Sequence, residues 1–258
     1  MSRLIFDSHA HYDDEQFDSD REALLSSLPD KGVCGIINAA VDEQSAADSI
    51  RLTERFSFLY TAVGVHPQAA LGVDPERLCD WIIPLLSHPK VVAVGEIGLD
   101  YHYEDACPRE QQQKVFEKQL EMAVEKDFPV VVHDREAHAD TLALLKKYRP
   151  RGVVHCFSGS VQMMREVVSL GMFIGLGGVV TFKNAKHPVA VAEAVPLDRL
   201  LLETDAPYMA PVPLRGHRCD SSMISYTVER IAELRGMKAE DLLQKTAENA
   251  ALLFGINR

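Results

Sequence analysis

The sequence of 258 residues predicts a TIM-type (β/α)8 barrel, an α/β fold that a single domain forms over residues 1–258, with extra helices at its C-terminal end. Three observations favour this fold. The length suits a barrel of about 250 residues, and eight apolar runs alternate with stretches of helical period. Runs such as Val91–Val94 and Val130–Val132 are apolar throughout, as expected for parallel strands that are covered on both faces. Eight β-then-α units indicate a barrel rather than an open doubly wound sheet.

One strand is expected at each β-branched or apolar run. The expected strands are Leu4–His9, Val33–Ala39, Phe58–His66, Val91–Ile97, Pro129–His133, Gly152–Phe157, Met172–Gly177 and Leu200–Glu203. Helical periodicity predicts the helices Asp20–Leu28, Glu43–Arg55, Pro75–Leu86, Arg109–Lys126, Glu136–Lys147, Val161–Leu170, Pro188–Val195, Ser221–Arg235 and Ala239–Leu253. No GxGxxG or Walker pattern opens any of these helices, which argues against a nucleotide cofactor. Prolines and charges in Ala210–Cys219 predict a long loop after the last strand, on the active-site face.

Composition and charge are those of an ordinary globular protein. Apolar residues make up 47% of the chain and charged residues 25%, which are usual values. No apolar stretch reaches the roughly 20 residues that cross a bilayer, and the N-terminus leaves no room for a signal peptide, so we expect a cytoplasmic protein that does not span a membrane. The five cysteines include no CxxC pair and indicate free thiols. The net charge of −11 argues against a broad basic nucleic-acid surface, but not against a local cationic site. Nothing in the sequence marks an obligate protein partner.

Two histidines close the first expected strand, in Asp7-Ser8-His9-Ala10-His11. Side chains two positions apart leave an extended strand by the same face, so the two imidazoles can converge on one point. Neutral imidazole is the commonest metal ligand in proteins, and the pair therefore indicates a metal ion. Two ordinary polar residues at a strand exit would give the same pattern, so the other ligand-type residues decide between the two interpretations.

Those residues fall at the C-terminal ends of other expected strands. They are His66, Glu96, His133, His155 and Asp205. Taken singly, each has an ordinary explanation as a hydrogen-bonded or ion-paired group at a strand end, but the strand ends of a barrel meet at one mouth. Six of the candidate ligands exceed the three or four that one zinc ion takes, and we expect two divalent metal ions with Glu96 as the bridge. These six are His9, His11, Glu96, His133, His155 and Asp205.

Five segments resemble the TatD family of metal-dependent hydrolases, within the amidohydrolase-like barrels, and occur in that family's order. They are Phe6–His11, Gly64–Pro67, Gly95–Tyr101, His155–Gly159 and Leu202–Pro207, and the resemblance runs from residue 4 to residue 255. It implies that His9, His11, Glu96 and Asp205 hold one metal, and that Glu96, His133 and His155 hold the other. It also implies divalent-metal-dependent DNase activity, often from the 3′ end. The stretch Arg215–Ser222 departs from the Arg-Asn-Glu-Pro-like sequence that the family commonly has there, which bears on substrate choice rather than on metal binding.

The expected reaction is hydrolysis of a phosphodiester, with DNA as the expected partner. Two divalent ions facing the ionised Glu96 and Asp205 leave a net positive site that suits an anionic substrate and activates a water, whose proton Asp205 would accept. Glu203 either orients a ligand histidine or takes part directly. His66 is expected to contact phosphate or to assist the leaving group. Candidate substrate contacts are the loop cations Lys183, Arg215 and Arg218, and the stacking rings Tyr101 and Tyr103.

Two other functions stay open at this point. A hydrolase of a small amide, lactone or ester would use the same two metals on a carbonyl group; such enzymes often bridge their metals with a modified lysine on strand four, where this chain has Glu96. A non-catalytic metal-binding protein is the weaker alternative, because the rim also carries Asp205 as a potential base. The metal stays open among zinc, manganese, nickel, iron and magnesium.

Overall fold

A computed structural model describes residues 4–103 and 107–256, and within them eight parallel strands form one sheet in the order β1 to β8. A parallel bridge between Ala10 and Ala206 brings the last strand back to the first, so that the sheet curls into a nearly closed barrel. The predicted fold class is confirmed. The strands are β1 (Ile5–Ala10), β2 (Val33–Ala39), β3 (Leu59–Val63), β4 (Val91–Asp100), β5 (Val130–Arg135), β6 (Gly152–Val154), β7 (Phe173–Leu176) and β8 (Leu200–Leu202).

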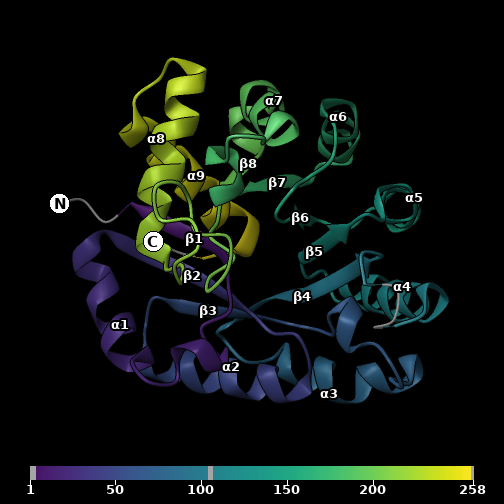
Figure 1. Ribbon diagram of the computed structural model, residues 1–258. Coiled ribbons are helices and arrows are strands. Elements are labelled where there is room, and N and C mark those ends of the chain that lie inside the picture. The colour runs from purple at the N-terminus through teal and green to yellow at the C-terminus, as the bar shows by residue number, and fades with distance from the viewer. Residues whose placement is uncertain (1–3, 104–106, 257–258) are drawn as a thin grey trace.

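Helices surround the strands in Figure 1, and each lies close to its predicted range. They are α1 (Arg21–Ser27), α2 (Glu43–Arg55), α3 (Leu78–Leu85), α4 (Arg109–Glu125), α5 (His138–Tyr148), α6 (Val161–Ser169), α7 (Lys186–Ala194), α8 (Ile224–Arg235) and α9 (Ala239–Phe254). Local chemistry sets several ends. The Asp42 carboxylate caps α2 by accepting a hydrogen bond from the Ser45 amide at 2.8 Å, and Gly236 and Gly255 end α8 and α9 with φ near +60°.

Some boundaries differ from the prediction. The strand predicted to end at Ile97 runs on to Asp100, because its last four residues pair with β5 from Val132 to Arg135. The strand predicted over Phe58–His66 ends at Val63. The predicted helix from Pro75 begins with a 3-10 turn over Pro75–Arg77. These differences concern only where individual strands and helices begin and end, and the topology is as predicted.

The barrel interior is filled at one end by apolar side chains and at the other by polar ones. Val131 and His133 share a face of β5, and Val153 and His155 share a face at the end of β6. In each pair, the valine lies in the apolar core and the histidine, two residues later, lies at the polar mouth. The apolar cluster draws on all eight strands and also includes Ala247, Ala250, Leu253 and Phe254. Helix α9 therefore closes the N-terminal end of the barrel.

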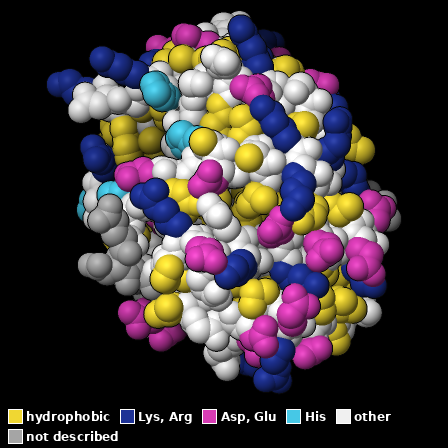
Figure 2. Space-filling view, turned by 90° about the vertical axis from the view of Figure 1, so that its right-hand side faces the viewer, with side chains coloured by type: hydrophobic (Ala, Val, Ile, Leu, Met, Phe, Trp, Pro, Cys, Tyr) yellow, Lys and Arg dark blue, Asp and Glu magenta, His cyan; other side chains and the backbone are white. Residues whose placement is uncertain are grey.

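The outer surface carries charges of both signs. On the face shown in Figure 2, Lys and Arg side chains lie among Asp and Glu side chains rather than in one basic patch. Among the described residues, no helix is long and apolar enough to cross a membrane.

Candidate metal centre

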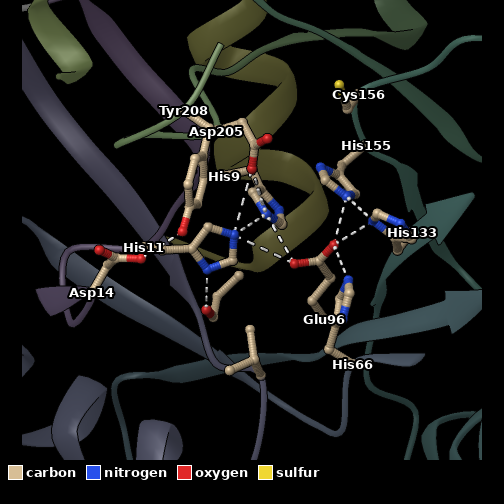
Figure 3. Close-up of polar contacts among 12 residues, drawn as sticks. His9, His11, Asp14, His66, Glu96, His133, His155, Cys156, Asp205 and Tyr208 are labelled. Carbon is tan, nitrogen blue, oxygen red and sulfur yellow. Dashed lines mark hydrogen bonds and ion pairs between the residues drawn. The ribbon is translucent and has the colours of Figure 1, made fainter. Parts of the chain in front are cut away.

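Seven polar side chains meet at the C-terminal mouth of the barrel. His9 and His11 come from the end of β1, Glu96 from β4 and His133 from β5, while His66, His155 and Asp205 follow β3, β6 and β8. Figure 3 shows Glu96 between two groups: His9, His11 and Asp205 lie on one side, and His66, His133 and His155 on the other. The predicted convergence of these residues on one point is therefore present in the structure.

The first group has the spacing of a metal site. The Nε2 atoms of His9 and His11 lie 3.0 Å apart, and they lie 3.3 and 3.4 Å from Oε2 of Glu96. Their distances to Oδ1 of Asp205 are 3.6 and 3.4 Å. Ligand atoms held tetrahedrally at about 2.0–2.2 Å from one ion are about 3.3–3.6 Å apart. Four of these five distances lie in that range, and the distance between the two histidine nitrogens is shorter.

The second group faces the other oxygen of Glu96. Oε1 lies 2.8 Å from Nδ1 of His133 and 2.7 Å from Nε2 of His155, and these two nitrogens are 3.2 Å apart. His66 Nε2 is 3.6 Å from the same oxygen, so His66 stands among the ligand-type atoms rather than beside them. One carboxylate thus presents each of its oxygens to a different set of imidazoles.

Groups behind the imidazoles hold two of them in place by hydrogen bonds, and a carboxylate lies near a third. The Ala39 carbonyl accepts from Nδ1 of His11 at 2.8 Å, which leaves Nε2 pointing into the centre. Asp100 Oδ2 lies 3.3 Å from Nε2 of His133. Glu203 Oε1 lies 3.8 Å from Nδ1 of His155. Such outer partners fix the ring orientation of metal-binding histidines.

Asp205 reaches the centre through an unusual backbone conformation. Its φ is +66°, in the left-handed region that non-glycine residues rarely adopt. The Asp205 amide donates to the His9 carbonyl at 2.9 Å and the Ala10–Ala206 bridge follows, so pairing with the end of β1 holds this conformation. The chain thereby turns its carboxylate toward the two histidines of β1. Strained residues of this kind are concentrated at functional sites.

Burial and mutual charge set the protonation of the centre. Burial lowers the pKa of His9 to about 4 and that of His66 to about 3, so both imidazoles are neutral, as metal ligands must be. Burial opposes the charged form of His11 as well, but Asp205 and Glu96 outweigh it and raise the pKa of His11 to about 10. Burial also opposes ionisation of Glu96, yet the surrounding histidines hold its pKa well below the usual range.

The residues present fit divalent metal ions. Nε2 of His9, His11 and His155 and Nδ1 of His133 face one another and the carboxylates of Glu96 and Asp205 at ligand spacing. Burial opposes the charged form of His133 too, but Asp100 and Glu96 raise its pKa to about 9. A bound cation would therefore replace the protons that His11 and His133 otherwise carry. Histidine with carboxylate is also the donor set that zinc and other transition metals take.

The centre opens into a cavity of about 950 Å³, a size usual for a small-molecule or nucleotide site. Six of the seven residues line the cavity, while His9 lies buried beneath it. One wall is apolar and is formed by Phe157, Leu176, Val179, Val180, Pro188 and Met209. The cavity can therefore hold a substrate with both a polar reacting group and an apolar or aromatic part.

The predicted substrate contacts lie elsewhere, with one exception. Arg218 forms a two-pronged ion pair with Asp20 at 2.8 and 2.6 Å, and Arg215 stacks on Phe182 at 4.3 Å. Lys183 is exposed outside the cavity lining. Tyr101 is buried, and its hydroxyl donates to Asp140 at 2.8 Å. Only Tyr103 lines the cavity.

Sequence reasoning missed three other residues of this mouth. Arg135 ends β5 and lines the cavity, and its position two residues after His133 on one strand was the available signal. Asp100 stands four residues after Glu96 on β4, an even spacing that also indicates a shared face. Tyr208, from the loop after β8, donates to Asp14 at 2.7 Å, and no pattern in the sequence indicates that contact.

Comparison with known proteins agrees with this geometry. The family model described as "TatD related DNase" matches residues 6–255. The chain is 40% identical over 257 residues to the "Uncharacterized metal-dependent hydrolase YabD" of Bacillus subtilis strain 168, covering 98% of this chain and all of that one. It is 33% identical to the "3'-5' ssDNA/RNA exonuclease TatD" of Pantoea vagans strain C9-1, covering 97% and 99% of the two chains. The crystal structure of YjjV, a TatD homologue from Escherichia coli K12, superimposes with a TM-score of 0.92 at 34% identity over the whole of both chains. The chain belongs to the TatD-related DNase family and is a metal-dependent hydrolase.

Proposed function

We propose that this protein is a phosphodiesterase that shortens single-stranded nucleic acid from the 3′ end, with two divalent metal ions at the mouth of the barrel. The observation that carries the proposal is the position of Glu96. Its two oxygens face separate ligand sets, the nearest atoms of which lie 3.3 Å from Oε2 and 2.7 Å from Oε1. A carboxylate bridging two ions is the arrangement of hydrolytic two-metal sites. A relative that is 33% identical bears the name of a 3′–5′ exonuclease, which supports the same choice of substrate.

The ligands divide between the two ions as the distances suggest. His9, His11 and Asp205 would hold one ion, and His133 and His155 the other, with Glu96 shared and His66 Nε2 3.6 Å from the Glu96 oxygen of the second set. When bound, the ions supply positive charge for the phosphoryl oxygens and lower the pKa of a water. Asp100 keeps the imidazole of His133 oriented, and the Glu203 carboxylate lies 3.8 Å from Nδ1 of His155.

Asp205 is the group we assign to proton transfer. Burial alone would raise its pKa, but the hydrogen bond with His11 and the neighbouring imidazoles lower it, so Asp205 is ionised at neutral pH. Its Oδ1 atom faces the two histidines of β1, and the side chain is 17% exposed to the cavity. The second oxygen, Oδ2, can accept the proton of an attacking water. The apolar wall of the cavity gives a place for the base or sugar of the terminal nucleotide.

The test measures the length of a single-stranded oligonucleotide labelled at either end. Metal-stripped protein should leave the strand intact, and Mg²⁺, Mn²⁺ or Zn²⁺ should restore stepwise shortening. A strand labelled at its 5′ end should then give a series of shorter labelled products, whereas a 3′ label should be released in the first step. His133→Ala should abolish shortening, whereas the matched control His88→Ala, at the opposite end of the barrel before β4, should retain it. Metal analysis should give two ions per chain in the wild type. Bound metal without cleavage of any strand would refute the proposal and direct the search to small amides, lactones and phosphate esters.

A further inference from the structure

Arg135 holds an unusual position at the mouth of the barrel. It is the last residue of β5 and follows His133 by two positions, so both side chains leave the strand by the same face. A rise of about 3.3 Å per residue places Arg135 about 7 Å beyond His133, toward the opening of the cavity. Among the described residues that line the cavity, Arg135 is the only lysine or arginine.

The guanidinium group of Arg135 has no acidic partner in the part of the chain that the structure describes. It lies over the ring of Tyr103, whose centroid is 5.1 Å away. Two other arginines near this mouth are fully engaged. Arg218 binds Asp20, and Arg21 donates to Asp18 and to backbone carbonyls of the loop after β1.

This lack of a partner is informative because the cavity is rich in carboxylates. The two acids nearest to Arg135 along the strands already have partners: Asp134 lies 2.8 Å from Nδ1 of His138, and Asp100 accepts from Gln68 and faces His133. Five N–H donors of a half-buried arginine thus remain for a ligand. A planar fork of donors suits phosphate oxygens better than any other anion-binding side chain.

We propose that Arg135 binds the substrate phosphate next to the one that is hydrolysed, and that Tyr103 holds the guanidinium plane in position. This inference rests on the proposed nuclease function and names the feature of the substrate that the mouth recognises. The metal ligands would receive the scissile phosphate, and Arg135, two residues beyond His133 on β5, would receive the neighbouring phosphate. Arg135 would therefore favour a strand with at least two phosphates over a neutral ester or a single phosphodiester.

The experiment compares two trinucleotides in the metal-loaded protein. One has two ordinary phosphodiesters, and the other has a neutral methylphosphonate at the linkage next to the scissile bond. Arg135→Ala should lower kcat/KM for the ordinary trinucleotide about 10- to 100-fold and leave the methylphosphonate substrate nearly unchanged. Arg135→Lys should recover part of the loss, because it restores charge without the fork. The matched control Arg165→Ala, on the exposed side of α6, should change neither value.

A binding measurement separates failure of this inference from failure of the nuclease function. Fluorescence anisotropy of a labelled oligothymidylate with metal-loaded Asp205→Asn protein reports binding without turnover. Adding Arg135→Ala should weaken binding and reduce the slope of log K against log salt by about 0.7, the value for one phosphate of a single strand. That result without hydrolysis by the wild type would support the inference and reject the nuclease. Equal losses on both trinucleotides, an unchanged salt slope, or no binding of the strand would overturn the inference.

Discussion

A buried carboxylate outside the metal centre, Asp7, fastens the first strand of the barrel to the last. Its Oδ1 atom accepts from the amides of Thr204 and His9 at 3.0 and 3.2 Å, and its Oδ2 atom from the hydroxyls of Thr204 and Ser221, both at 2.6 Å. The side chain is fully buried. We expect Asp7→Ala to leave these four donors without an acceptor and to open a small cavity at the β1–β8 seam.

The structure sets the size of this effect. A buried donor that loses its partner costs about 1–3 kcal/mol, and rotation of the two hydroxyls toward other acceptors reduces their share, so the two amides dominate. The expected loss in the free energy of unfolding is about 4 kcal/mol. Burial raises the pKa of Asp7 to about 6, so the charge itself is unfavourable there. Asp7→Asn keeps the shape without the charge and should cost about 2 kcal/mol or less.

Urea unfolding of the metal-free proteins, followed by circular dichroism, measures both changes without a contribution from metal binding. Asp198→Ala, which removes an exposed carboxylate before β8, is the matched control and should stay within about 0.5 kcal/mol of the wild type. A loss below about 1 kcal/mol for Asp7→Ala, or an Asn variant less stable than the Ala variant, would refute the account of this seam.

Three further predictions concern the metal centre and the closed end of the barrel. Asp205→Asn should keep the metal content, measured by mass spectrometry, and lower kcat about 10²- to 10⁴-fold, since it removes the proton acceptor; unchanged turnover would reject Asp205 as the base. Restoring metal to stripped protein at about 100 times its dissociation constant should stabilise the fold by about 2.7 kcal/mol for each ion bound, seen in calorimetry as a rise in Tm of about 5–10 °C per ion, and His133→Ala should reduce this rise. Phe254→Ala should cost about 3 kcal/mol in urea unfolding, because its ring is 5% exposed against the barrel interior; full metal content in the folded variant would show that the two ends of the barrel are independent.

The barrel was predictable because strand and helix patterns repeat with little interruption. Runs such as Val91–Val94 are apolar at every position, which is the pattern of a strand covered on both faces. Once a closed barrel is inferred, the ligand positions follow from topology, since residues at strand ends must meet whatever their separation in sequence. This is why His9 and Asp205, nearly two hundred residues apart, were correctly placed together.

Loop side chains were less predictable, because their contacts depend on two loops at once. Arg218 pairs with Asp20, which lies 198 residues earlier, and neither neighbourhood alone indicates the partner. Tyr101 lies against Asp140 because β4 continues to Asp100 and stays paired with β5 to its end, a register that hydrophobic periodicity cannot show. The cation that does line the cavity, Arg135, lies on a strand two residues beyond a predicted ligand.

The stretch that departs from the family pattern, Arg215–Ser222, acts on the shape of the mouth rather than on the metal ligands. Arg218 joins it to the loop after β1 through Asp20, and Ser221 joins it to Asp7 and to the hydroxyl of Tyr12. This stretch therefore holds the two loops beside the Asp205 side of the centre, where Tyr208 also contacts Asp14. On the opposite rim, Arg135 at the end of β5 and Tyr103 after β4 make none of these contacts with the described residues. Sequence change in Arg215–Ser222 can consequently alter the seam and the width of the mouth, while the residues that would receive a substrate phosphate stay on the regular frame of the barrel.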